Sequence, residues 1–393
     1  MKEREVVIID GCRTINARAH KTKGAFRNIR SDHLLREVYK AVFARNPKVK
    51  SEDVNEVWNG TSALTGMTSW ADRNAWLTAG YPEEVPIASV SALCPSSMFA
   101  AEICIKNILL GDSDISLATG IEDMLHVPMG VGRDNDPDLA KRYTSQDLAM
   151  GITAEKVAKL YNVDRKDMEL MAYHSHKRAA AARDAGKFKH EIIPIEGEKE
   201  DGTRYMCVDD QWIRESVNLE QMAAMKPAFD PDNGAVTAAT SSPLSTGACA
   251  MLLMSREKAD KLGLDYHLKY KASARTSVDP TIMGIGPIYS VKKLLAKTDM
   301  TIEDIDVVEL NEAFASQSLA CVRELGLEKQ PPFEKTNLWG GAIALGHPLG
   351  ESGLRIMITL NNVMKYETPD AKYGMAALCG GLGPTGAMIW ERV

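Results

Sequence analysis

No stretch of this sequence is apolar for long enough to cross a membrane, because every run falls short of the roughly 18 residues that a spanning helix needs. Positive charge is not in excess either: 47 Lys and Arg stand against 53 Asp and Glu, a net charge of −6. This balance argues against broad nucleic-acid binding, although not against a local basic patch for an anionic ligand. Neither a secretory leader nor an Arg/Ser-rich transit peptide precedes the strand-like run at 6–9, so we expect a cytoplasmic protein.

The sequence also lacks paired cysteine motifs. Its seven cysteines are odd in number, scattered, and never in CxxC spacing. This pattern is typical of free thiols in a reducing compartment and argues against a disulfide framework or a zinc site. The cysteines are Cys12, Cys94, Cys104, Cys207, Cys249, Cys321 and Cys379.

What is present is ordinary for a globular protein. The 393 residues are 45% hydrophobic and 25% charged, and this length suggests two or three domains. Strand-like runs at 6–9, 54–59 and 115–118 alternate with helical patterns at 31–43 and 98–110. The alternation predicts an α/β fold with a covered sheet.

Two parts of the chain resemble each other. The segment Ser-Glu-Asp-Val-Asn-Glu-Val-Trp-Asn-Gly at 51–60 is similar to Ile-Glu-Asp-Ile-Asp-Val-Val-Glu-Leu-Asn at 302–311. A bend at Cys94 that precedes a helical pattern corresponds to a bend at His347 that precedes another, at nearly the same separation. We therefore predict two copies of one α/β unit.

The stretch between the copies, roughly 120–245, is rich in charge, Met and Ala and is interpreted as an inserted cap. Helices are expected at 151–161 and 165–185, and 196–203 is rich in turn residues. A basic run includes Lys177, Arg178, Arg183, Lys187 and Lys189. It is interpreted either as a contact for a phosphate-bearing ligand or, favoured by the charge pattern, as a solvated helix face.

Cys94 is the first candidate for chemistry. It stands directly before Pro95, which suits a first helical position, so we expect the thiol at a helix N-terminus. The positive end of the helix would lower the pKa of the thiol and supply a thiolate. The competing interpretation is a small buried apolar residue, the usual role of an arbitrary cysteine.

His347 lies in a bend dense in glycine, with Gly346 before it and Gly350 after it. Glycine lets the backbone approach a ligand closely, and Pro348 stiffens the bend behind the imidazole. A structural histidine is the competing interpretation.

Cys379 ends an apolar run and enters the turn Gly-Gly-Leu-Gly at 380–383, whose backbone N–H groups could form an oxyanion hole. A plain turn between strands is the alternative. Asn311 and Glu312 follow the strand-like run 305–310, where α/β sites form, although Asn311 could instead cap a helix. A thiol, an imidazole and a second thiol are the groups that acyl transfer through a thioester needs.

Together these segments resemble the thiolase family. The pattern Asn-Glu-Ala-Phe-Ala stands at 311–315, and Gly-Gly-Ala-Ile-Ala-Leu-Gly-His-Pro-Leu-Gly at 340–350. Further matches are Met-Gly-Ile-Gly-Pro at 283–287, Phe-Asp-Pro-Asp-Asn-Gly at 229–234 and Met-Gly-Ile-Thr-Ala-Glu at 150–155. The resemblance covers essentially the whole chain. Ser-Ser-Met after Cys94 and the Cys-x-Gly-Leu-Gly ending are more similar to the bacterial fatty-acid β-oxidation thiolases than to the biosynthetic type.

The resemblance implies a role for each candidate. Cys94 would be the acylated nucleophile, His347 its base, and Cys379 the acid/base for the departing acetyl-CoA enolate. Asn311 would hold the water that, with His347, stabilises the enolate oxygen. The N–H groups of Cys94 and Gly381 would receive the oxyanion of the acyl-enzyme. Residues implied to contact coenzyme A or substrate are Ser242, Arg214 and Met150.

The resemblance also implies a thiolase-like fold, in which two α/β halves form an α-β-α-β-α core under a loop domain. We expect an N-terminal half at 1–119 plus 246–268, a coenzyme A-binding cap at 120–245 and a C-terminal half at 269–393. Coenzyme A would be a substrate, with no cofactor bound permanently and no metal. Expected partners are acyl-CoA, a second copy in a homodimer or a dimer of dimers, and other β-oxidation enzymes, but neither nucleic acid nor a membrane span.

The expected activity is thiolytic cleavage of a 3-oxoacyl-CoA, which makes the protein an acyltransferase. Departures from the family pattern keep open a condensing thiolase for a branched, cyclic or aromatic acyl-CoA. The departing positions are Ser91, Ala92, Pro95, Gln211, Ala239, Pro243, Thr246, Pro384 and Thr385. A non-catalytic subunit of a multi-enzyme complex is a further alternative, disfavoured because Cys94, His347, Cys379 and Asn311 are all retained.

Overall fold

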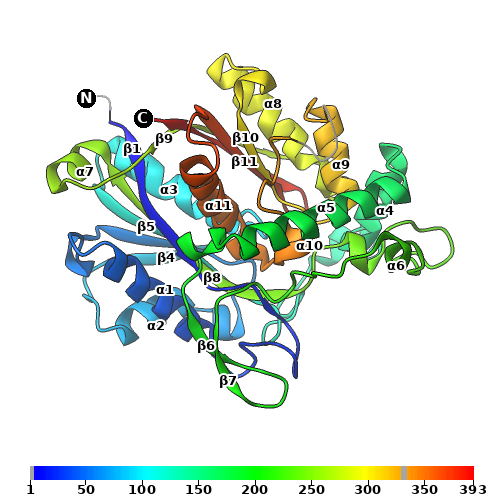
Figure 1. The fold of residues 1–393 in the computed structure, drawn as a ribbon, viewed down its shortest axis with the longest axis horizontal. Coiled ribbons are helices and arrows are strands. Elements are labelled where there is room, and N and C mark those ends of the chain that lie inside the picture. Colours follow the sequence, from blue (N-terminus) through cyan, green and yellow to red (C-terminus); the bar gives the residue numbers. More distant parts are fainter. Residues whose placement is uncertain (1–3, 329–333) are drawn as a thin grey trace.

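The computed structural model describes residues 4–328 and 334–393, and its N-terminal half is a mixed sheet between helices (Figure 1). Strand β5 is buried along its whole length because α1 covers one face and α3 the other. The elements of this half are β1 (Val6–Arg13), β2 (Ala17–Arg18), α1 (Ser31–Arg45), β3 (Glu56–Gly60), α2 (Ala71–Thr78), β4 (Ile87–Val90), α3 (Ser96–Leu110), β5 (Ile115–Asp123), β8 (Ser245–Ser255) and α7 (Arg256–Leu262).

The C-terminal half repeats much of this order of elements, although its described residues have no strand at the position of β4. A short 3₁₀ turn at Ser51–Asp53 leads into β3, and a matching turn at Ile302–Asp304 leads into β10, which confirms the predicted repeat. The elements of this half are β9 (Leu268–Ser277), α8 (Gly286–Thr298), β10 (Val307–Leu310), α9 (Ala315–Glu324), α10 (Ala342–Leu345), α11 (Ser352–Tyr366), β11 (Tyr373–Cys379) and β12 (Pro384–Arg392).

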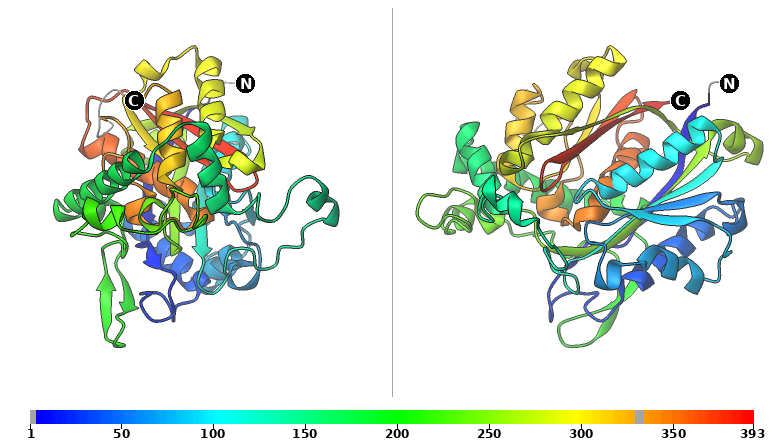
Figure 2. Two further views of the ribbon diagram at one scale, coloured as in Figure 1. Left: turned by 90° about the vertical axis from the view of Figure 1, so that its right-hand side faces the viewer. Right: turned by 180° about the vertical axis from the view of Figure 1, so that it is seen from behind.

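The two halves form the five-layered arrangement expected of the family. The strands follow the order β10-β11-β12-β9-β1-β8-β5-β3-β4, and the halves meet at the antiparallel pair Val7 and Lys269. Helix α1 covers the outer face of the first half and α8 that of the second, while α3 and α11 lie between them. The views in Figure 2 show these central helices between the two groups of strands.

The central helices cross in close contact near their N-termini. A Cβ atom at Gly353 would lie 2.8 Å from the Met98 backbone nitrogen, so glycine is needed for this approach. The Ser97 hydroxyl donates to the Glu351 carbonyl (2.9 Å) and accepts from the Leu354 N–H (2.8 Å). These contacts bring the bends before α3 and α11 to the same place.

The cap comprises α4 (Met150–Leu160), α5 (Arg165–Asp184), α6 (Leu219–Ala223) and the hairpin β6 (Ile195–Glu198) and β7 (Arg204–Cys207). Figure 1 shows the hairpin projecting from the body. The prediction of a turn-rich segment at 196–203 is therefore wrong for its first residues. Gly197 lies in a strand, where it pairs with Tyr205, and glycine is needed there because a Cβ atom would lie 2.6 Å from Cys207 Sγ.

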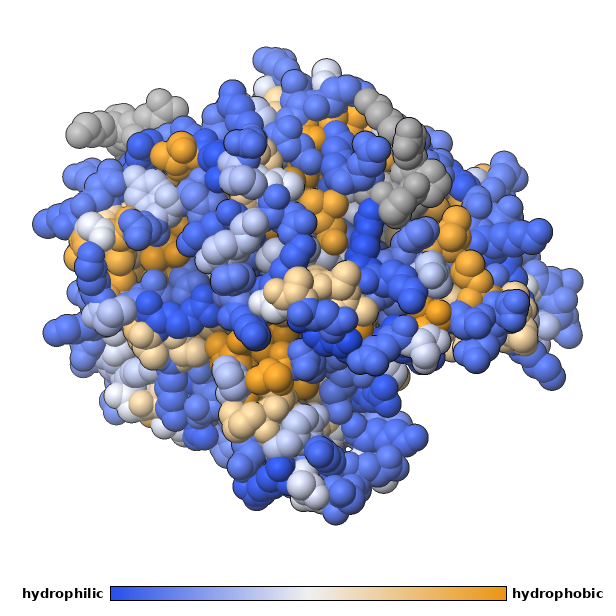
Figure 3. All heavy atoms as spheres, in the orientation of Figure 1, coloured by the Kyte–Doolittle hydropathy of each residue, from blue (hydrophilic) through white to orange (hydrophobic). Residues whose placement is uncertain are grey.

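In the face shown in Figure 3, hydrophilic side chains predominate and apolar ones gather in separate patches. Among the described residues, no helix combines the length and apolar character that a membrane span requires. The same residues contain no group of three or more His, Cys, Asp or Glu side chains arranged to hold a metal ion.

Candidate active site

Cys94 lies on the tight bend between β4 and α3. Leu93 has left-handed backbone (φ +61°), and the Ser96 hydroxyl accepts from the Ala92 N–H (2.9 Å) and donates to the Leu93 carbonyl (2.5 Å). The helix begins at Ser96 with Pro95 as its N-cap, whereas Pro95 was expected as the first helical residue. The bend holds the Cys94 side chain buried, just outside the helix end.

Burial raises the pKa of the Cys94 thiol to about 12, although the backbone N–H groups of Gly381 and of Cys94 itself act in the opposite direction. The prediction of a pKa lowered by the helix N-terminus is therefore wrong. The cost of a thiolate in this apolar surrounding exceeds the stabilisation by the helix end, so Cys94 rests as a neutral thiol. The same two N–H groups are placed to receive the oxygen of a group attached to its sulfur.

His347 is the hydrogen-bond partner of this thiol. Its Nε2 lies 3.3 Å from Cys94 Sγ, and its Nδ1 lies 2.7 Å from Ser352 Oγ. The Ser352 hydroxyl donates to the Pro348 carbonyl (3.3 Å), which leaves its oxygen to accept the Nδ1 proton of His347. This chain of hydrogen bonds assigns the free lone pair to Nε2, where it accepts the Cys94 S–H.

The imidazole is neutral as well. Burial, helped by the charge of Arg355, lowers the pKa of His347 to about 3. Its backbone N–H donates to Ser245 Oγ (3.2 Å), which anchors the bend to β8. A neutral base in contact with a neutral thiol can take the proton as the sulfur forms a new bond.

Cys379 ends β11 and is almost completely buried. Burial raises the pKa of the Cys379 thiol well above its usual range, and the negative charge of an ionised Cys94 would raise it further. The two thiols are therefore close enough to interact electrostatically. The following turn packs on the Cys94 bend, because a Cβ atom at Gly380 would lie 2.6 Å from Pro95 Cδ.

Asn311 and Glu312 follow β10 directly. The Asn311 amide is buried, and neither its nitrogen nor its oxygen has a hydrogen-bond partner among the described residues. It does not cap a helix, since α9 begins at Ala315 with Phe314 at its N-cap. The N-cap alternative is thus wrong, and the amide keeps both its donor and its acceptor for a bound molecule.

Glu312 fixes the glycine-rich segment that leads to His347. Its carboxylate accepts from Ser175 Oγ (2.6 Å), Asn337 Nδ2 (2.8 Å) and the Ile343 N–H (3.2 Å). A Cβ atom at Gly341 would lie 2.1 Å from this carboxyl group. Glu312 therefore has a structural part in the site, and glycine at 341 is required beside it.

A cavity of about 300 Å³ with mainly apolar walls opens at Cys94 and His347. Cys379 and Asn311 are not among the described residues that line it, and Arg214 lines a neighbouring cavity of about 260 Å³. Of the eight predicted site residues, the cavity brings together Cys94, His347, Gly381, Ser242 and Met150.

Two models of one protein family match nearly the whole chain. The family model for the thiolase N-terminal domain matches residues 6–257, and that for the thiolase C-terminal domain matches 264–392. The chain belongs to the thiolase family.

Several bacterial thiolases are similar to this chain. The 3-ketoacyl-CoA thiolase of Vibrio parahaemolyticus is 45% identical over 390 residues, covering 99% of this chain and 98% of that protein. The 3-ketoacyl-CoA thiolase of Vibrio cholerae El Tor is 46% identical over 388 residues, covering 98% and 99%. Among solved structures, the acetyl-CoA acetyltransferase of Syntrophomonas wolfei has a TM-score of 0.88 at 33% identity, with each chain covered completely. That of Bacillus anthracis has a TM-score of 0.88 at 31% identity, covering 100% and 99%.

The neighbouring cavity of this thiolase meets the catalytic one at Ser241 and Pro243. Arg214 is exposed there, and its backbone N–H donates to His176 Nδ1 (3.3 Å). Burial and the charge of Arg214 lower the pKa of His176 to about 4. Arg214 therefore offers its guanidinium beside a neutral imidazole.

The basic run around α5 is interpreted from the sequence either as a contact for a phosphate-bearing ligand or as a solvated helix face. Its contacts match neither interpretation fully. Arg178 donates to the Thr336 carbonyl (2.6 Å), Arg183 pairs with Glu215 (2.9 Å), and Lys187 pairs with Glu367. Lys177 and Lys189 are exposed. Arg178 and Lys187 thus join the cap to the C-terminal half, which a charge pattern alone does not reveal.

Two of the departures from the thiolase pattern, Gln211 and Thr246, serve the scaffold. The Gln211 Oε1 accepts from the Arg18 and Ala25 N–H groups, each at 2.9 Å. The Thr246 hydroxyl donates to Asp123 Oδ1 (3.1 Å). Of the nine departing positions, only Pro243 lines the catalytic cavity.

Sequence reasoning missed Ser352 and Ser245, the two hydroxyls that hold His347. Ser352 is the first residue of α11. The signal that could have found it is its spacing: a hydroxyl five residues after a histidine, at the first turn of a helix, can face back to the ring.

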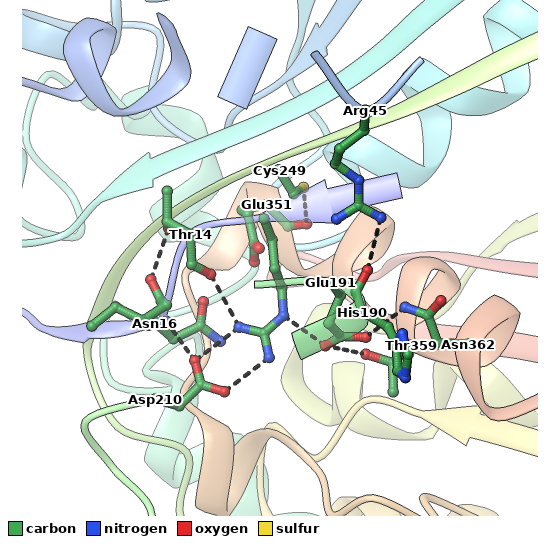
Figure 4. A network of polar contacts seen from close by, with 12 residues as sticks. Thr14, Asn16, Arg45, His190, Glu191, Asp210, Cys249, Glu351, Thr359 and Asn362 are labelled. Carbon is green, nitrogen blue, oxygen red and sulfur yellow. Dashed lines mark hydrogen bonds and ion pairs between the residues drawn. The ribbon is translucent and has the colours of Figure 1, made fainter. Parts of the chain in front are cut away.

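A buried ion network joins α11 to the cap (Figure 4). The guanidinium of Arg13 pairs with Glu191 (2.8 Å) and Asp210 (2.8 Å), and all three side chains are fully buried. Glu191 also accepts from Thr359 (3.2 Å) and Asn362 (3.1 Å) on α11. The network therefore helps to fix the helix that carries Ser352.

Proposed function

We propose that this protein is an acyltransferase that cleaves a 3-oxoacyl-CoA by thiolysis, giving acetyl-CoA and a shortened acyl-CoA. The observation that carries the proposal is the Cys94 thiol, 3.3 Å from His347 Nε2 in an apolar cavity. The similarity to proteins named 3-ketoacyl-CoA thiolase, at 45–46% identity over almost the whole chain, supports it.

In the first half-reaction, Cys94 sulfur bonds to the β-carbonyl carbon while its proton passes to His347 Nε2. The N–H groups of Cys94 and Gly381 receive the oxygen that becomes negative. The bond between the α and β carbons then breaks, and its electron pair leaves with acetyl-CoA as an enolate. Asn311 and His347 support the enolate oxygen, and the Cys379 thiol gives the α-carbon a proton.

In the second half-reaction, the thiol of coenzyme A gives its proton to the Cys379 thiolate and attacks the acyl group on Cys94. The Cys94 sulfur leaves and takes back the proton held by His347. Both proton carriers return to their starting state, so coenzyme A acts as a substrate and no permanently bound cofactor is needed. The raised pKa of Cys379 suits this role, because the group must hold its proton until the enolate forms.

The cap residues Arg214, Ser242 and Met150 would bind coenzyme A. Arg214 supplies a positive charge in the cavity next to the catalytic one. Ser242 and Met150 line the catalytic cavity itself, where the pantetheine arm must end for its sulfur to reach Cys94. One cavity thus carries a positive charge and the next has mainly apolar walls. This pair suits coenzyme A, which is anionic at one end and carries its thiol on an uncharged arm at the other.

A condensing reaction, the reverse of thiolysis, is the second candidate. The structural similarity to two acetyl-CoA acetyltransferases favours it, because the same groups serve both directions. The alternative of a non-catalytic subunit does not require the contact between Cys94 and His347 or the orienting bond from Ser352, and it is therefore less favoured.

We further propose a cytoplasmic homodimer or dimer of dimers that associates with other β-oxidation enzymes. All seven cysteines are free and buried, as in proteins of a reducing compartment. Strand β4 ends the sheet order among the described residues, which leaves an edge on which a second copy could pair.

The test is thiolysis of a panel of 3-oxoacyl-CoA thioesters with coenzyme A. The measurements are the loss of substrate and the formation of acetyl-CoA. We expect turnover by the wild type and none above background by Cys94→Ala. No turnover of any thioester in either direction would overturn the proposal.

A further inference from the structure

A second cavity, of about 200 Å³, adjoins the catalytic one. The two cavities share Met124, Met129, Arg133 and Leu349 as walls. The cavity that contains Arg214 joins the catalytic one elsewhere, at Ser241 and Pro243, and has no lining residue in common with the second cavity. A substrate at Cys94 therefore has one exit toward Arg214 and another toward Arg133.

Arg133 is the only cationic side chain among the described residues that line the catalytic and second cavities, since His347 is neutral. The described residues supply no hydrogen bond, ion pair or aromatic contact to its guanidinium. Its charge acts on the Cys94 thiol and opposes the rise in the pKa of that thiol. An unpaired guanidinium thus lies within electrostatic reach of the reacting sulfur.

The loop that carries Arg133 rests on the N-terminal half. The Arg133 N–H donates to the Gly130 carbonyl (3.2 Å) and closes a turn. Gly132 has left-handed backbone (φ +74°), and a Cβ atom there would lie 3.1 Å from Thr65 Oγ1. The backbone before Arg133 is therefore held against the wall of the second cavity.

Glu122 is the only acidic side chain among the described residues of this cavity, and it is already engaged. Its Oε2 accepts from the Ser62 N–H (2.7 Å) and the Gly350 N–H (2.9 Å). Burial raises the pKa of Glu122, which favours its neutral form. Its interaction with backbone N–H groups leaves Arg133 as the group that would meet a charged ligand.

The remaining walls suit a short methylene chain. Leu64, Met129 and Val131 line the second cavity and are each about half exposed, so they surround its mouth with apolar surface. An acyl chain that leaves Cys94 past Met124 would run along this surface and end at the guanidinium. A methyl end would leave Arg133 without a partner, whereas a carboxylate would form a charge-assisted pair with it.

We propose that the second cavity holds the distal end of the acyl chain and that Arg133 selects 3-oxoacyl-CoA substrates whose chain ends in a carboxylate. The inference rests on the proposed thiolysis at Cys94 and adds a substrate class to it. The chemistry at Cys94 is unchanged; the carboxylate only binds.

The test compares two thioesters of equal chain length, 3-oxohexanedioyl-CoA and 3-oxohexanoyl-CoA, by their kcat/KM values. We expect the wild type to favour the first by about tenfold or more, and the preference to shrink as salt is added. Arg133→Met should reduce the ratio to about one, and Arg133→Lys should restore part of it. Arg142→Met is the matched control, because Arg142 lies on the same segment, contacts Tyr143 and lines neither cavity; it should keep the wild-type ratio.

An equal or higher kcat/KM of the wild type for 3-oxohexanoyl-CoA would overturn the inference while leaving thiolysis intact. A wild-type ratio that survives in Arg133→Met would do the same, since the preference would then arise elsewhere. Turnover of neither thioester, with no turnover of the wider panel, would overturn the proposed function and this inference together.

Discussion

Cys94 and His347 both rest without charge in this structure. Burial raises the pKa of the thiol to about 12 and lowers the pKa of the imidazole to about 3. A resting thiolate–imidazolium pair would need the pKa of Cys94 to lie below the pKa of His347. The proton transfer from sulfur to Nε2 must therefore accompany attack on the substrate, which is general-base catalysis of a neutral nucleophile.

Because Cys94 and His347 are both neutral at rest, we predict that the ultraviolet absorbance of a Cys94 thiolate is absent near neutral pH. A thiol with a pKa of about 12 stays protonated across the range from about pH 5 to about pH 9, since ionisation begins only as pH approaches the pKa. The absorbance difference between wild type and Cys94→Ala should thus stay flat over this range. A step centred below about pH 8 would contradict a resting neutral thiol.

Ser352 is predicted to be a positioning residue. Ser352→Ala removes the acceptor of the Nδ1 proton of His347, so the ring can turn or change tautomer. We expect kcat to fall about tenfold to a hundredfold with the KM for coenzyme A little changed. Ser352→Thr, which keeps the hydroxyl, should recover part of the loss.

The matched control for this variant is Ser290→Ala. Ser290 is also a buried serine near the start of a helix; it donates to the Pro287 carbonyl (3.3 Å), lies 3.2 Å from Thr385 Oγ1 and does not line the catalytic cavity. It should leave kcat unchanged. Equal loss of kcat in the two variants would mean that Ser352 acts through folding alone.

At the scale of elements, the position of His347 depends on how α11 is held. Gly353 permits the close crossing with α3, and the Arg13 network ties α11 to the cap through Glu191. Arg13, Glu191 and Asp210 are fully buried, so removal of the one cation would leave two buried carboxylates without a compensating positive charge.

Arg13→Met is therefore predicted to lower the free energy of unfolding by about 3–5 kcal/mol, measured by denaturant unfolding. The control is Lys141→Met, which removes an ion pair with Asp138 whose side chains are 75% and 74% exposed. That variant should change stability by less than about 1 kcal/mol. Equal stability of Arg13→Met and wild type would show that the network does not hold the cap.

Sequence reasoning found the elements and groups that local patterns specify. The α/β alternation, the two repeated units and the bends at Cys94 and His347 follow from apolar periodicity and from glycine and proline. What it could not predict depends on distant residues. The pKa of Cys94 reflects burial, opposed by a backbone N–H from the distant residue Gly381, and Gly197 lies in a strand because it pairs with Tyr205.

At the scale of the whole molecule, the repeat explains why the site lies where it does. Each half supplies one bend before a central helix, and the crossing of α3 and α11 brings Cys94 and His347 within hydrogen-bond distance. We propose the division into 1–119 with 246–268, 120–245 and 269–393 on this basis. The cap then closes the cavity from the side of Met150 and Ser242.

The central claim is that Cys94 carries the acyl group. Incubation of the protein with a 3-oxoacyl-CoA in the absence of coenzyme A, followed by intact mass measurement and peptide mapping, tests it directly. We predict one acyl group per chain on the peptide that contains Cys94, and its loss when coenzyme A is added. Acylation of another residue, or none while acetyl-CoA is released, would contradict the account.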